Sequence, residues 1–505
     1  MSDLNSTTSP PSVPVELPQP IKKKIVLRRS AAKEVFPPTP KYKVEQQQQQ
    51  EQSILSSESL KPSCRHGSIT RFRYLTEKNE NESSSSSSSS LLDIKRIIEI
   101  EFQFDKEDEN TFKPGDYLSI FAPNPFNVVE SIANRLNLNL NDRLDIEMIV
   151  VQEGKVVNLP DNLKRANART IGYLLSHELD ICGIPSKRLL RLLGENASDQ
   201  EEKKKLVHLS SIEGKEDYNQ MIGNRITLLD LLISYPSISN IPLHYLVDFI
   251  SPLVPRDYSI SSSPLSSQPR HATVVFSVVD MNINQKEIKG LCTSWLEDKC
   301  NESILNNIQQ LNIDNNNNNN NNNNTTTTII NNIPYEIKPT NHFTLPKDTL
   351  KTPMIMIGPG TGVAPFIGFL SHLEKTKQPD LKLAETWLFF GCRSESYDFI
   401  YRDEIESFVK NGTLSHLVTA FSRESKDQSS QPLGYVQSKL LNHSSQLFNL
   451  ITNNNATIYI CGDAKGMAVG VKSAFIEIVK KELKMMMTNK QMKLFLNGLQ
   501  IKDIY

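Results

Sequence analysis

The sequence contains no apolar run close to the ~18 residues that a membrane-spanning helix needs. Its first residues lack the charged and then apolar segments that mark a signal peptide. The sequence also has no large excess of positive or negative charge, because 56 Lys and Arg residues balance 57 Asp and Glu residues. No overall basic field therefore favours nucleic acid or an anionic membrane. Together these absences predict a soluble, cytoplasmic chain.

Paired cysteines are also missing. The six cysteines are Cys64, Cys182, Cys292, Cys300, Cys392 and Cys461, and no two of them form a CxxC pair. This scatter argues against a disulfide framework and against a zinc or iron–sulfur site. We expect reduced thiols and no metal.

Three segments lack the apolar residues that a folded core needs. Residues 1–60 are rich in Pro, Ser and Gln, residues 83–90 are a serine run, and residues 315–328 are an asparagine tract that runs into threonines. Such segments cannot bury enough apolar surface to offset the entropy of ordering. The composition predicts a disordered tail and two low-complexity inserts.

The rest of the first part reads as a β domain, placed at 61–345, with a helical insertion. Residues 94–104 alternate apolar and polar side chains, and strand patterns return at 118–123 and 273–281. Between about 125 and 250 the apolar residues recur at helical spacing instead.

The last part, 346–505, alternates strands with helices. PMIMIG, TWLFFG, LSHLVTAF and TIYICG read as buried strands, and APFIGFLSHLEK and YRDEIESFVKNG read as helices that follow them. This alternation predicts a parallel, doubly wound sheet that binds a nucleotide.

The segment from Arg256 to Ser259 combines groups that suit a flavin dinucleotide. Arg256 can neutralise a pyrophosphate, Tyr258 can lie against the isoalloxazine ring, and the Ser259 hydroxyl can bond to it; Asp257 lies between them. Alone, the segment could equally be a polar turn. A second phosphate site is suggested by Gly290, Leu291, Cys292 and Thr293. These residues start a predicted helix, where backbone N–H groups can bind an anion. Alternatively, Thr293 only caps the helix.

Three features of the last domain point to a nucleotide. Gly360, Thr361 and Gly362 follow a strand and open a helix, where backbone amides can bind phosphate, although tight packing alone would also need glycine. Ser422, Arg423, Tyr435 and Gln437 could bind the 2′-phosphate of NADPH, or form surface contacts only. Cys461 ends the last predicted strand, a position also typical of a small buried residue.

In their order along the chain, these motifs resemble a known family. A set of motifs is similar to those of the ferredoxin–NADP⁺ reductase superfamily, in its diflavin reductase branch: RDYSISSS, GLCTSWL, GPGTGVAPFIGFL, LFFGCRSESYDFIYRDEI, FSRE, YVQ and IYICGDAKGMA. Residues 181–222 resemble the connecting region of these reductases, and WLFFGCR leans toward methionine synthase reductases. The resemblance spans about 60–505 and implies an antiparallel β-barrel FAD domain with a helical connecting insertion, then an NADP-binding domain.

The resemblance also implies roles for single residues. FAD would contact Arg256, Asp257, Tyr258, Ser259, Val275, Phe276, Ser277, Gly290, Leu291, Cys292 and Thr293, and NADPH would contact Gly360, Thr361, Gly362, Ser422, Arg423, Tyr435 and Gln437. Ser259, Cys461 and Asp503 match the trio around the hydride path in this family, and Tyr505 takes the place of its flavin-stacking tryptophan. Asp503 and Tyr505 would otherwise be read as a frayed end.

The chain departs from the family pattern at several positions. Leu433 replaces a frequent lysine and Gly470 a frequent acid, and residues 1–90 show no flavodoxin-like pattern. The resemblance therefore implies FAD and NADPH in this chain, with FMN on a separate flavodoxin-like partner. It also implies cobalamin-dependent methionine synthase as the final electron acceptor. Two alternatives stay open: a general NADPH diaphorase for a cytochrome, quinone or flavodoxin, and a catalytically silent binding protein.

Overall fold

The structure is a computed structural model. It describes residues 42–47, 65–76, 95–105, 112–148, 159–239, 241–265, 268–315, 329–378, 382–424, 434–483 and 501–504. Tyr505, Leu433 and the serine run at 83–90 lie outside these ranges. Within them, no helix combines the length and the apolar character that crossing a membrane requires.

The first domain is built on a six-stranded antiparallel sheet. Its strands are β2 (Arg65–Tyr74), β3 (Ile97–Gln103), β4 (Tyr117–Ile120), β6 (Arg256–Ser259), β7 (His271–Ser277) and β10 (Ile330–Lys338). They lie in the order β6-β4-β10-β2-β3-β7. The two outer strands approach each other just past the end of β6, where Ile260 forms a bridge with Val274. One face of the sheet carries a buried apolar core that includes Phe102, Leu118 and Tyr335.

One strand lies where composition predicts disorder. β1 (Tyr42–Gln47) pairs antiparallel with β5 (Arg143–Met148), so the prediction of a disordered tail over 1–60 is wrong for these six residues. The reason is that the hydrogen bonds between two strands join backbone N–H and C=O groups. Every residue except proline has both groups, so polar residues can also form a strand. A composition average over sixty residues does not detect six residues that find a partner strand.

The predicted strand at 273–281 is divided in two. β7 ends at Ser277, and β8 (Asp280–Ile283) instead forms a hairpin with β9 (Lys286–Lys289). Asn284 and Gln285 join the hairpin with φ angles of 51° and 66°. Two successive positive φ values define the turn type that fits the twist of a two-residue hairpin, and asparagine adopts them readily.

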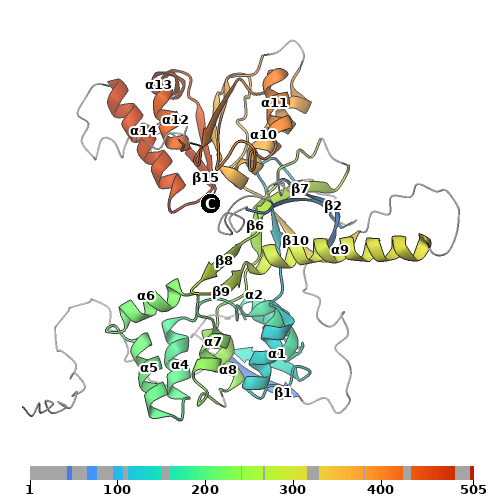
Figure 1. The fold of residues 1–505 in the computed structure, drawn as a ribbon, viewed down its shortest axis with the longest axis vertical. Helices are drawn as coiled ribbons and strands as arrows, with labels where there is room; N and C mark the ends of the chain where they lie inside the picture. The colour runs from blue at the N-terminus through green and yellow to red at the C-terminus, as the bar shows by residue number, and fades with distance from the viewer. Residues whose placement is uncertain are drawn as a thin grey trace, which may run out of the picture. The chain divides into compact units, whose positions relative to one another are not determined.

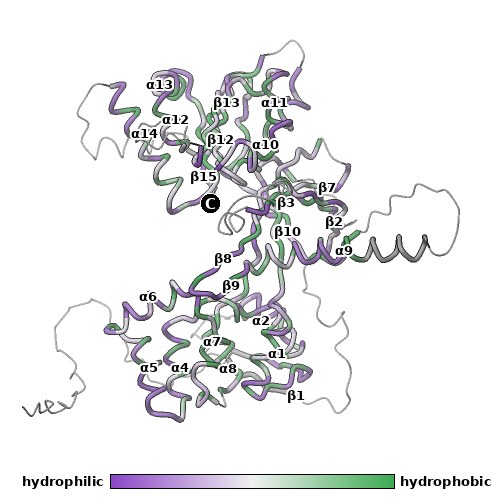
Figure 2. The backbone as a smooth tube through the Cα atoms, in the orientation of Figure 1, coloured by the Kyte–Doolittle hydropathy of each residue, from purple (hydrophilic) through white to green (hydrophobic). Residues whose placement is uncertain are grey.

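The helical insertion lies between β4 and β6, as the periodicity predicts. It contains α1 (Phe126–Arg135), α2 (Asp161–Ala166), α3 (Ile171–Tyr173), the π-helix η3 (Leu174–Glu178), α4 (Lys187–Glu195), α5 (Gln200–Ser210), α6 (Lys215–Gly223), α7 (Leu228–Ser234) and α8 (Leu243–Phe249). Polar caps fix several starts: Ser186 accepts from the Leu189 amide, and Thr227 and Asp230 form a capping box. Lys286 of β9 also bonds to Asp230. Polar residues line α5 in the hydropathy view, as expected for a solvent-facing helix (Figure 2).

The second domain has the predicted parallel sheet. Its strands are β11 (Met354–Ile357), β12 (Thr386–Cys392), β13 (His416–Phe421), β14 (Thr457–Cys461) and β15 (Ile501–Ile504), in the order β13-β12-β11-β14-β15. The helices are α10 (Ala364–Thr376), α11 (Arg402–Lys410), α12 (Val436–Asn442), α13 (Ser444–Asn453) and α14 (Met467–Leu483). α10 and α11 cover one face of the sheet, and α12 to α14 cover the other (Figure 1). The four strands read from the sequence are confirmed.

Alternate residues of β14 belong to different cores. Ile458 and Ile460 pack with α12 to α14, whereas Tyr459 and Cys461 pack with α10 and α11. The second of these cores also contains Val275 of β7, from the six-stranded sheet. Both sheets therefore contribute to one apolar cluster, on the face of β14 that carries the Cys461 thiol.

Each domain contains one of the chain's two tryptophans. Trp295 lies on α9 (Leu291–Asn315) and packs against the core of the six-stranded sheet, and Trp387 is buried in β12.

Candidate functional site

The predicted flavin residues of three separate segments meet around Tyr258. The Tyr258 ring lies 5.7 Å from the Phe276 ring, measured between centroids. Burial, and then the neighbouring Cys292 thiol, raises the pKa of Tyr258 well above its usual value. Burial likewise raises the pKa of the Cys292 thiol to about 11. The structure thus brings β6, β7 and the start of α9 together around one uncharged aromatic group.

The start of α9 offers donors for an anion. The first amides of a helix, here those of Leu291 to Thr293, have no carbonyl partner within it. Gly290 allows the chain to close here, because a Cβ would lie 2.6 Å from Thr293 Oγ1 and 2.7 Å from Val279 Cβ. Two buried hydroxyl oxygens, Ser277 Oγ and Ser294 Oγ, have no hydrogen-bond partner. Unsatisfied donors beside a helix start fit the pyrophosphate of FAD.

Arg256 and Asp257 differ in what holds them. Arg256 donates from Nη1 to the Val254 carbonyl at 2.6 Å, and its guanidinium keeps further donors. Asp257 accepts from Ser119 Oγ at 2.5 Å and pairs with Lys338 Nζ at 3.0 Å. Arg256 therefore suits an anionic ligand, whereas Asp257 is held in a network of its own domain.

Ser259 and Cys461 come close together although they lie far apart in the sequence. Their side chains lie near one another at the ends of β6 and β14: Tyr117, which is paired with Ser259, packs against the cluster that contains Cys461. Burial raises the pKa of the Cys461 thiol to about 12, and the neighbouring Ser259 hydroxyl opposes this only in part. The thiol is therefore protonated at neutral pH, so this junction carries no thiolate charge.

Tyr117 is a further residue at this junction, one that the motif analysis does not identify. It pairs with Ser259 in the register of β4 and β6. Burial, and then the nearby Cys461, raises the pKa of Tyr117 to about 12. One sequence feature could have identified Tyr117. The turn at 113–116 fixes where β4 begins and therefore which residue is paired with Ser259.

Asp503 lies on the opposite face of the parallel sheet from Cys461. It is paired with Ile460 in the register of β14 and β15, and Cys461 is paired with Ile504. Since side chains alternate along a strand, Asp503 leaves the sheet on the side opposite to Cys461. Its carboxylate forms an ion pair with Lys472 Nζ of α14 at 2.7 Å. The expected cluster of Ser259, Cys461 and Asp503 around one point is thus corrected by the strand register, and Tyr505 lies outside the described residues.

The glycine-rich loop after β11 is shaped by close contacts. A Cβ on Gly362 would lie 2.3 Å from the Cys461 carbonyl oxygen, so the loop packs directly against the end of β14. Gly360 has a φ of +56° and open space around its missing Cβ. Thr361 is half-buried between them, in the 3₁₀ turn Gly360–Val363 that precedes α10. Tight packing at Gly362 and open space at Gly360 therefore occur in the same loop.

The predicted 2′-phosphate residues gather at the end of β13. Ser422 and Arg423 are exposed, and their amides bond to the carbonyls of Cys392 and Arg393. A Cβ on Gly434 would lie 2.4 Å from Ser422 Cα, which places the next residue, Tyr435, beside Ser422. The side chain of Tyr435 is 56% exposed, so Ser422, Arg423 and Tyr435 all lie at the surface of this edge.

Gln437 occupies the room left by Gly470. A Cβ on Gly470 would lie 2.7 Å from Gln437 Nε2, and this nitrogen donates to the Met467 carbonyl at 3.4 Å. The acid that the family often has at this position would displace Gln437. The lack of a side chain at Gly470 therefore leaves the space that Gln437, a predicted NADPH contact, occupies.

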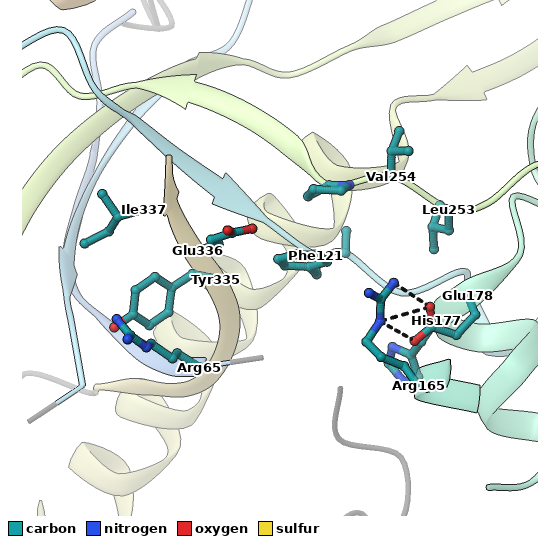
Figure 3. A pocket seen from close by; sticks show the side chains of 12 residues that line it. Arg65, Phe121, Arg165, His177, Glu178, Leu253, Val254, Tyr335, Glu336 and Ile337 are labelled. Carbon is teal, nitrogen blue, oxygen red and sulfur yellow. Dashed lines mark hydrogen bonds and ion pairs between the residues drawn. The ribbon is translucent and has the colours of Figure 1, made fainter. Parts of the chain in front are cut away.

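A cavity of about 430 Å³ lies elsewhere in the first domain, between the sheet and the helical insertion (Figure 3). It is lined by Arg65, Phe121, Ala122, Arg165, His177, Glu178, Leu253, Val254, Pro255, Tyr335, Glu336 and Ile337. None of the predicted site residues is among them. Arg165 binds Glu178 through two nitrogens, at 2.7 and 3.0 Å, and Tyr173 donates to the same carboxylate. Over the described ranges, no cluster of His, Cys, Asp or Glu could hold a metal.

The half-buried His177 in this cavity predicts a pH dependence of stability. Burial, and then the charge of Arg169, lowers the pKa of His177 from 6.5 to about 4. Below the unfolded-state value the unfolded chain binds a proton that the folded chain does not, so stability falls as pH falls from 6.5 toward 4. We expect His177 alone to contribute a loss of about 2 kcal/mol between roughly pH 7.5 and 5, a contribution that His177→Gln removes.

Chemical denaturation at both pH values measures this difference. His208→Gln, on the exposed face of α5, is the control and should retain the wild-type difference. An unchanged pH dependence in His177→Gln would contradict the prediction.

Comparison with known families agrees with this arrangement. A family model described as FAD binding domain matches residues 78–295, and one described as Oxidoreductase NAD-binding domain matches residues 356–473. The first match includes β6, β7 and the start of α9, and the second includes the loop after β11 and the end of β14. The two cofactors expected from the sequence, FAD and NADPH, are therefore supported.

Curated relatives show the same order of domains. Methionine synthase reductase of Rattus norvegicus is 35% identical over 80% of this chain and 58% of that protein. The Homo sapiens protein of the same name is 34% identical over 77% of this chain and 55% of that protein. NADPH–cytochrome P450 reductase of Dictyostelium discoideum is 33% identical over 75% of this chain and 50% of that protein. The chain spans about half the length of the curated relatives it matches, and with its FAD-binding and NAD-binding domains it belongs to the diflavin-type family of NADPH-dependent FAD reductases.

Proposed function

We propose that this chain takes a hydride from NADPH onto FAD and passes electrons to a flavodoxin-like FMN module that serves cobalamin-dependent methionine synthase. The observation that supports the proposal is the proximity of Ser259 on β6 to Cys461 on β14, through Tyr117 and the apolar cluster that both sheets share. The end of the strand proposed to hold the flavin thus lies near the end of a strand proposed to hold the nucleotide. In open α/β sheets, ligands bind at the carboxyl ends of the strands, where Cys461 lies.

The flavin site is assigned to one set of residues with separate tasks. Arg256 and the amides at the start of α9 would hold the pyrophosphate, Tyr258 would lie against the ring system, and Val275 to Ser277 would flank it. When bound, FAD would supply a ring that accepts a hydride and releases electrons one at a time. We expect the six-stranded sheet to serve as the β-barrel of this family, closed near the Ile260 bridge.

The residues at the junction would keep the hydride path free of anionic charge. The Cys461 thiol and the Tyr117 phenol stay protonated at neutral pH, as their raised pKa values require. A fixed anion here would oppose the transfer of a negatively charged hydride. Ser259 can offer its hydroxyl proton to the acceptor. Asp503 is proposed to act through Lys472 and the edge of β15, and Tyr505 is proposed to cover the flavin ring.

The nucleotide site uses the loop after β11 and the edge at β13. Gly360, Thr361 and Gly362 would hold the NADPH pyrophosphate at the start of α10, and Ser422, Arg423, Tyr435 and Gln437 would hold the adenosine end with its 2′-phosphate.

Rapid mixing of the flavin-loaded chain with NADPH tests the proposal. The flavin absorbance should bleach with NADPH much faster than with NADH. Adding a flavodoxin-type protein should then reoxidise the flavin, and coupling this pair to inactive methionine synthase should restore that enzyme. A chain that binds no FAD, or whose FAD is not bleached by NADPH, would refute the reductase function.

The identity to cytochrome P450 reductase supports a second acceptor, a cytochrome. One preparation compared with a flavodoxin-type protein, a quinone and cytochrome c separates the candidates, because the physiological type should give the highest kcat/KM.

Arg423 gives a sharper test of the nucleotide edge. Arg423→Ala should raise the KM for NADPH about tenfold or more and leave the KM for NADH unchanged, because it removes a charge-assisted bond to the 2′-phosphate only. Steady-state reduction of a dye with both nucleotides measures this ratio. Arg191→Ala, on the helical insertion, is the control and should alter neither value. Equal changes with NADPH and NADH would place Arg423 away from the 2′-phosphate.

A further inference from the structure

Tyr401 is a buried tyrosine that has no predicted role in either cofactor site. It precedes α11, is 5% exposed, and has a φ of +57° and a ψ of +28°. Bulky residues rarely adopt this left-handed conformation, because Cβ then approaches the backbone too closely. Such strain persists only where the surroundings fix the residue. The contacts of the Tyr401 side chain therefore show what holds this conformation in place.

The contacts of Tyr401 lie on the other sheet. Its hydroxyl is 3.3 Å from Ser261 Oγ, in the segment after β6, and burial, followed by the nearby charge of Glu99 on β3, raises the pKa of Tyr401. Glu99 is buried and accepts from Arg73 Nε at 2.8 Å. Arg73 in turn donates to Glu404 of α11 at 2.9 Å. The start of α11 is thus tied to the six-stranded sheet at two points.

Ser261 connects this tie to the proposed hydride path. Ser259 and Ser261 are two positions apart on an extended segment, so their side chains leave it on the same side. The Ser259 hydroxyl lies near Cys461, and the Ser261 hydroxyl contacts Tyr401. Between them, Ile260 is fully buried in the sheet core, and Ser261 is fixed by the Thr273 carbonyl, 2.8 Å from its amide.

We propose that Tyr401 is a positioning residue: its contact with Ser261 sets how closely Ser259 on β6 approaches Cys461 on β14. The proposal rests on the proposed function, since this approach matters for catalysis only if a hydride crosses there. Transfer rates fall steeply when reacting groups are misplaced by a fraction of an ångström. Removing one hydroxyl should therefore slow the transfer without emptying either cofactor site.

Tyr401→Phe tests the kinetic part. We expect flavin reduction by NADPH to slow about tenfold, while the FAD content and the KM for NADPH stay within about twofold. Tyr218→Phe is the matched control, because it also removes a hydrogen-bonded tyrosine hydroxyl, one that donates to the Pro185 carbonyl on the helical insertion. It should reduce flavin at the wild-type rate. An unchanged rate in Tyr401→Phe, or a loss of rate that only follows a loss of FAD, would overturn the proposal.

A cross-link measures the same geometry without catalysis. In the full-length Ser259→Cys variant, stripped of flavin, oxidised glutathione should join the introduced thiol to Cys461, which peptide mass spectrometry detects. Adding Tyr401→Phe should slow this reaction about fivefold or more, and adding Tyr218→Phe should not. Equal cross-linking rates would overturn the proposal.

A folding failure of Tyr401→Phe and a failure of the proposed function can each be distinguished from a failure of the Tyr401 proposal. Should Tyr401→Phe fail to fold, Ser261→Ala removes the same contact from the other side and should slow cross-linking alike. Should the wild-type chain fail to bleach FAD, the proposed function fails, while the cross-linking comparison still decides the role of Tyr401.

Discussion

Replacing Gly362 by alanine should destabilise the second domain by about 3 kcal/mol and raise the Kd for NADPH at least about tenfold. The new methyl carbon would lie 2.3 Å from the carbonyl oxygen of Cys461 and 3.0 Å from its carbonyl carbon. Both atoms belong to the backbone of β14, so no side-chain rotation relieves the collision. The loop that is proposed to hold the NADPH pyrophosphate must move instead. Denaturant unfolding and NADPH titration measure the two effects.

Gly412→Ala separates the collision from the general cost of replacing a glycine. Gly412 has a φ of +75° and no heavy atom within 4 Å of a built Cβ, so only backbone strain is added. We expect a loss of about 1 kcal/mol with no change in NADPH affinity. If Gly362→Ala were no more harmful than Gly412→Ala, the loop would not pack against β14 as described.

Replacing Ser259 by alanine should slow the reduction of FAD by NADPH about 10²-fold, which corresponds to about 2.7 kcal/mol of transition-state stabilisation. The change removes the hydroxyl that lies near Cys461 and creates no cavity larger than one oxygen atom. FAD content should stay unchanged, because Arg256 and the start of α9 are proposed to hold the pyrophosphate. Stopped-flow absorbance measures the rate, and the flavin spectrum measures the content.

Ser68→Ala is the control for this variant, since Ser68 makes only an exposed bond to Asn331, on β2 and β10. It should reduce flavin at the wild-type rate. A Ser259→Ala variant that kept the wild-type rate would remove Ser259 from the hydride path, whatever its proximity to Cys461.

Sequence patterns were sufficient where neighbouring residues decide the outcome. The strands β11, β12 and β14 are largely apolar and buried along their length, as parallel strands covered on both faces are, and these runs predict them; the edge strand β13 is more exposed. The helical insertion was found in the same way. The meeting of Ser259 with Cys461 was inferred from the order of motifs in a family, because no local pattern joins positions so far apart in the chain.

What the sequence left undetermined depends on register and on distant partners. Whether Asp503 faces Cys461 is decided by a single step in the pairing of β14 with β15, which composition does not encode. β1 forms only because β5 is available as its partner. Tyr117 and Tyr401 gain their surroundings from other strands. The turn at 113–116 indicates where β4 begins and therefore locates Tyr117, whereas the residues next to Tyr401 in the sequence do not indicate its partners.

The placement of Trp295 and Trp387 makes the intrinsic fluorescence of this chain a signal with two separate sources. Trp295 lies one turn beyond Cys292 on α9, against the core of the six-stranded sheet, and Trp387 stacks on His416 at 3.9 Å in the parallel sheet. Because no other residue is a tryptophan, each Trp→Phe variant leaves a spectroscopic reporter of one domain alone. The unfolding of the two halves, and their response to each nucleotide, can therefore be recorded independently without attaching any dye.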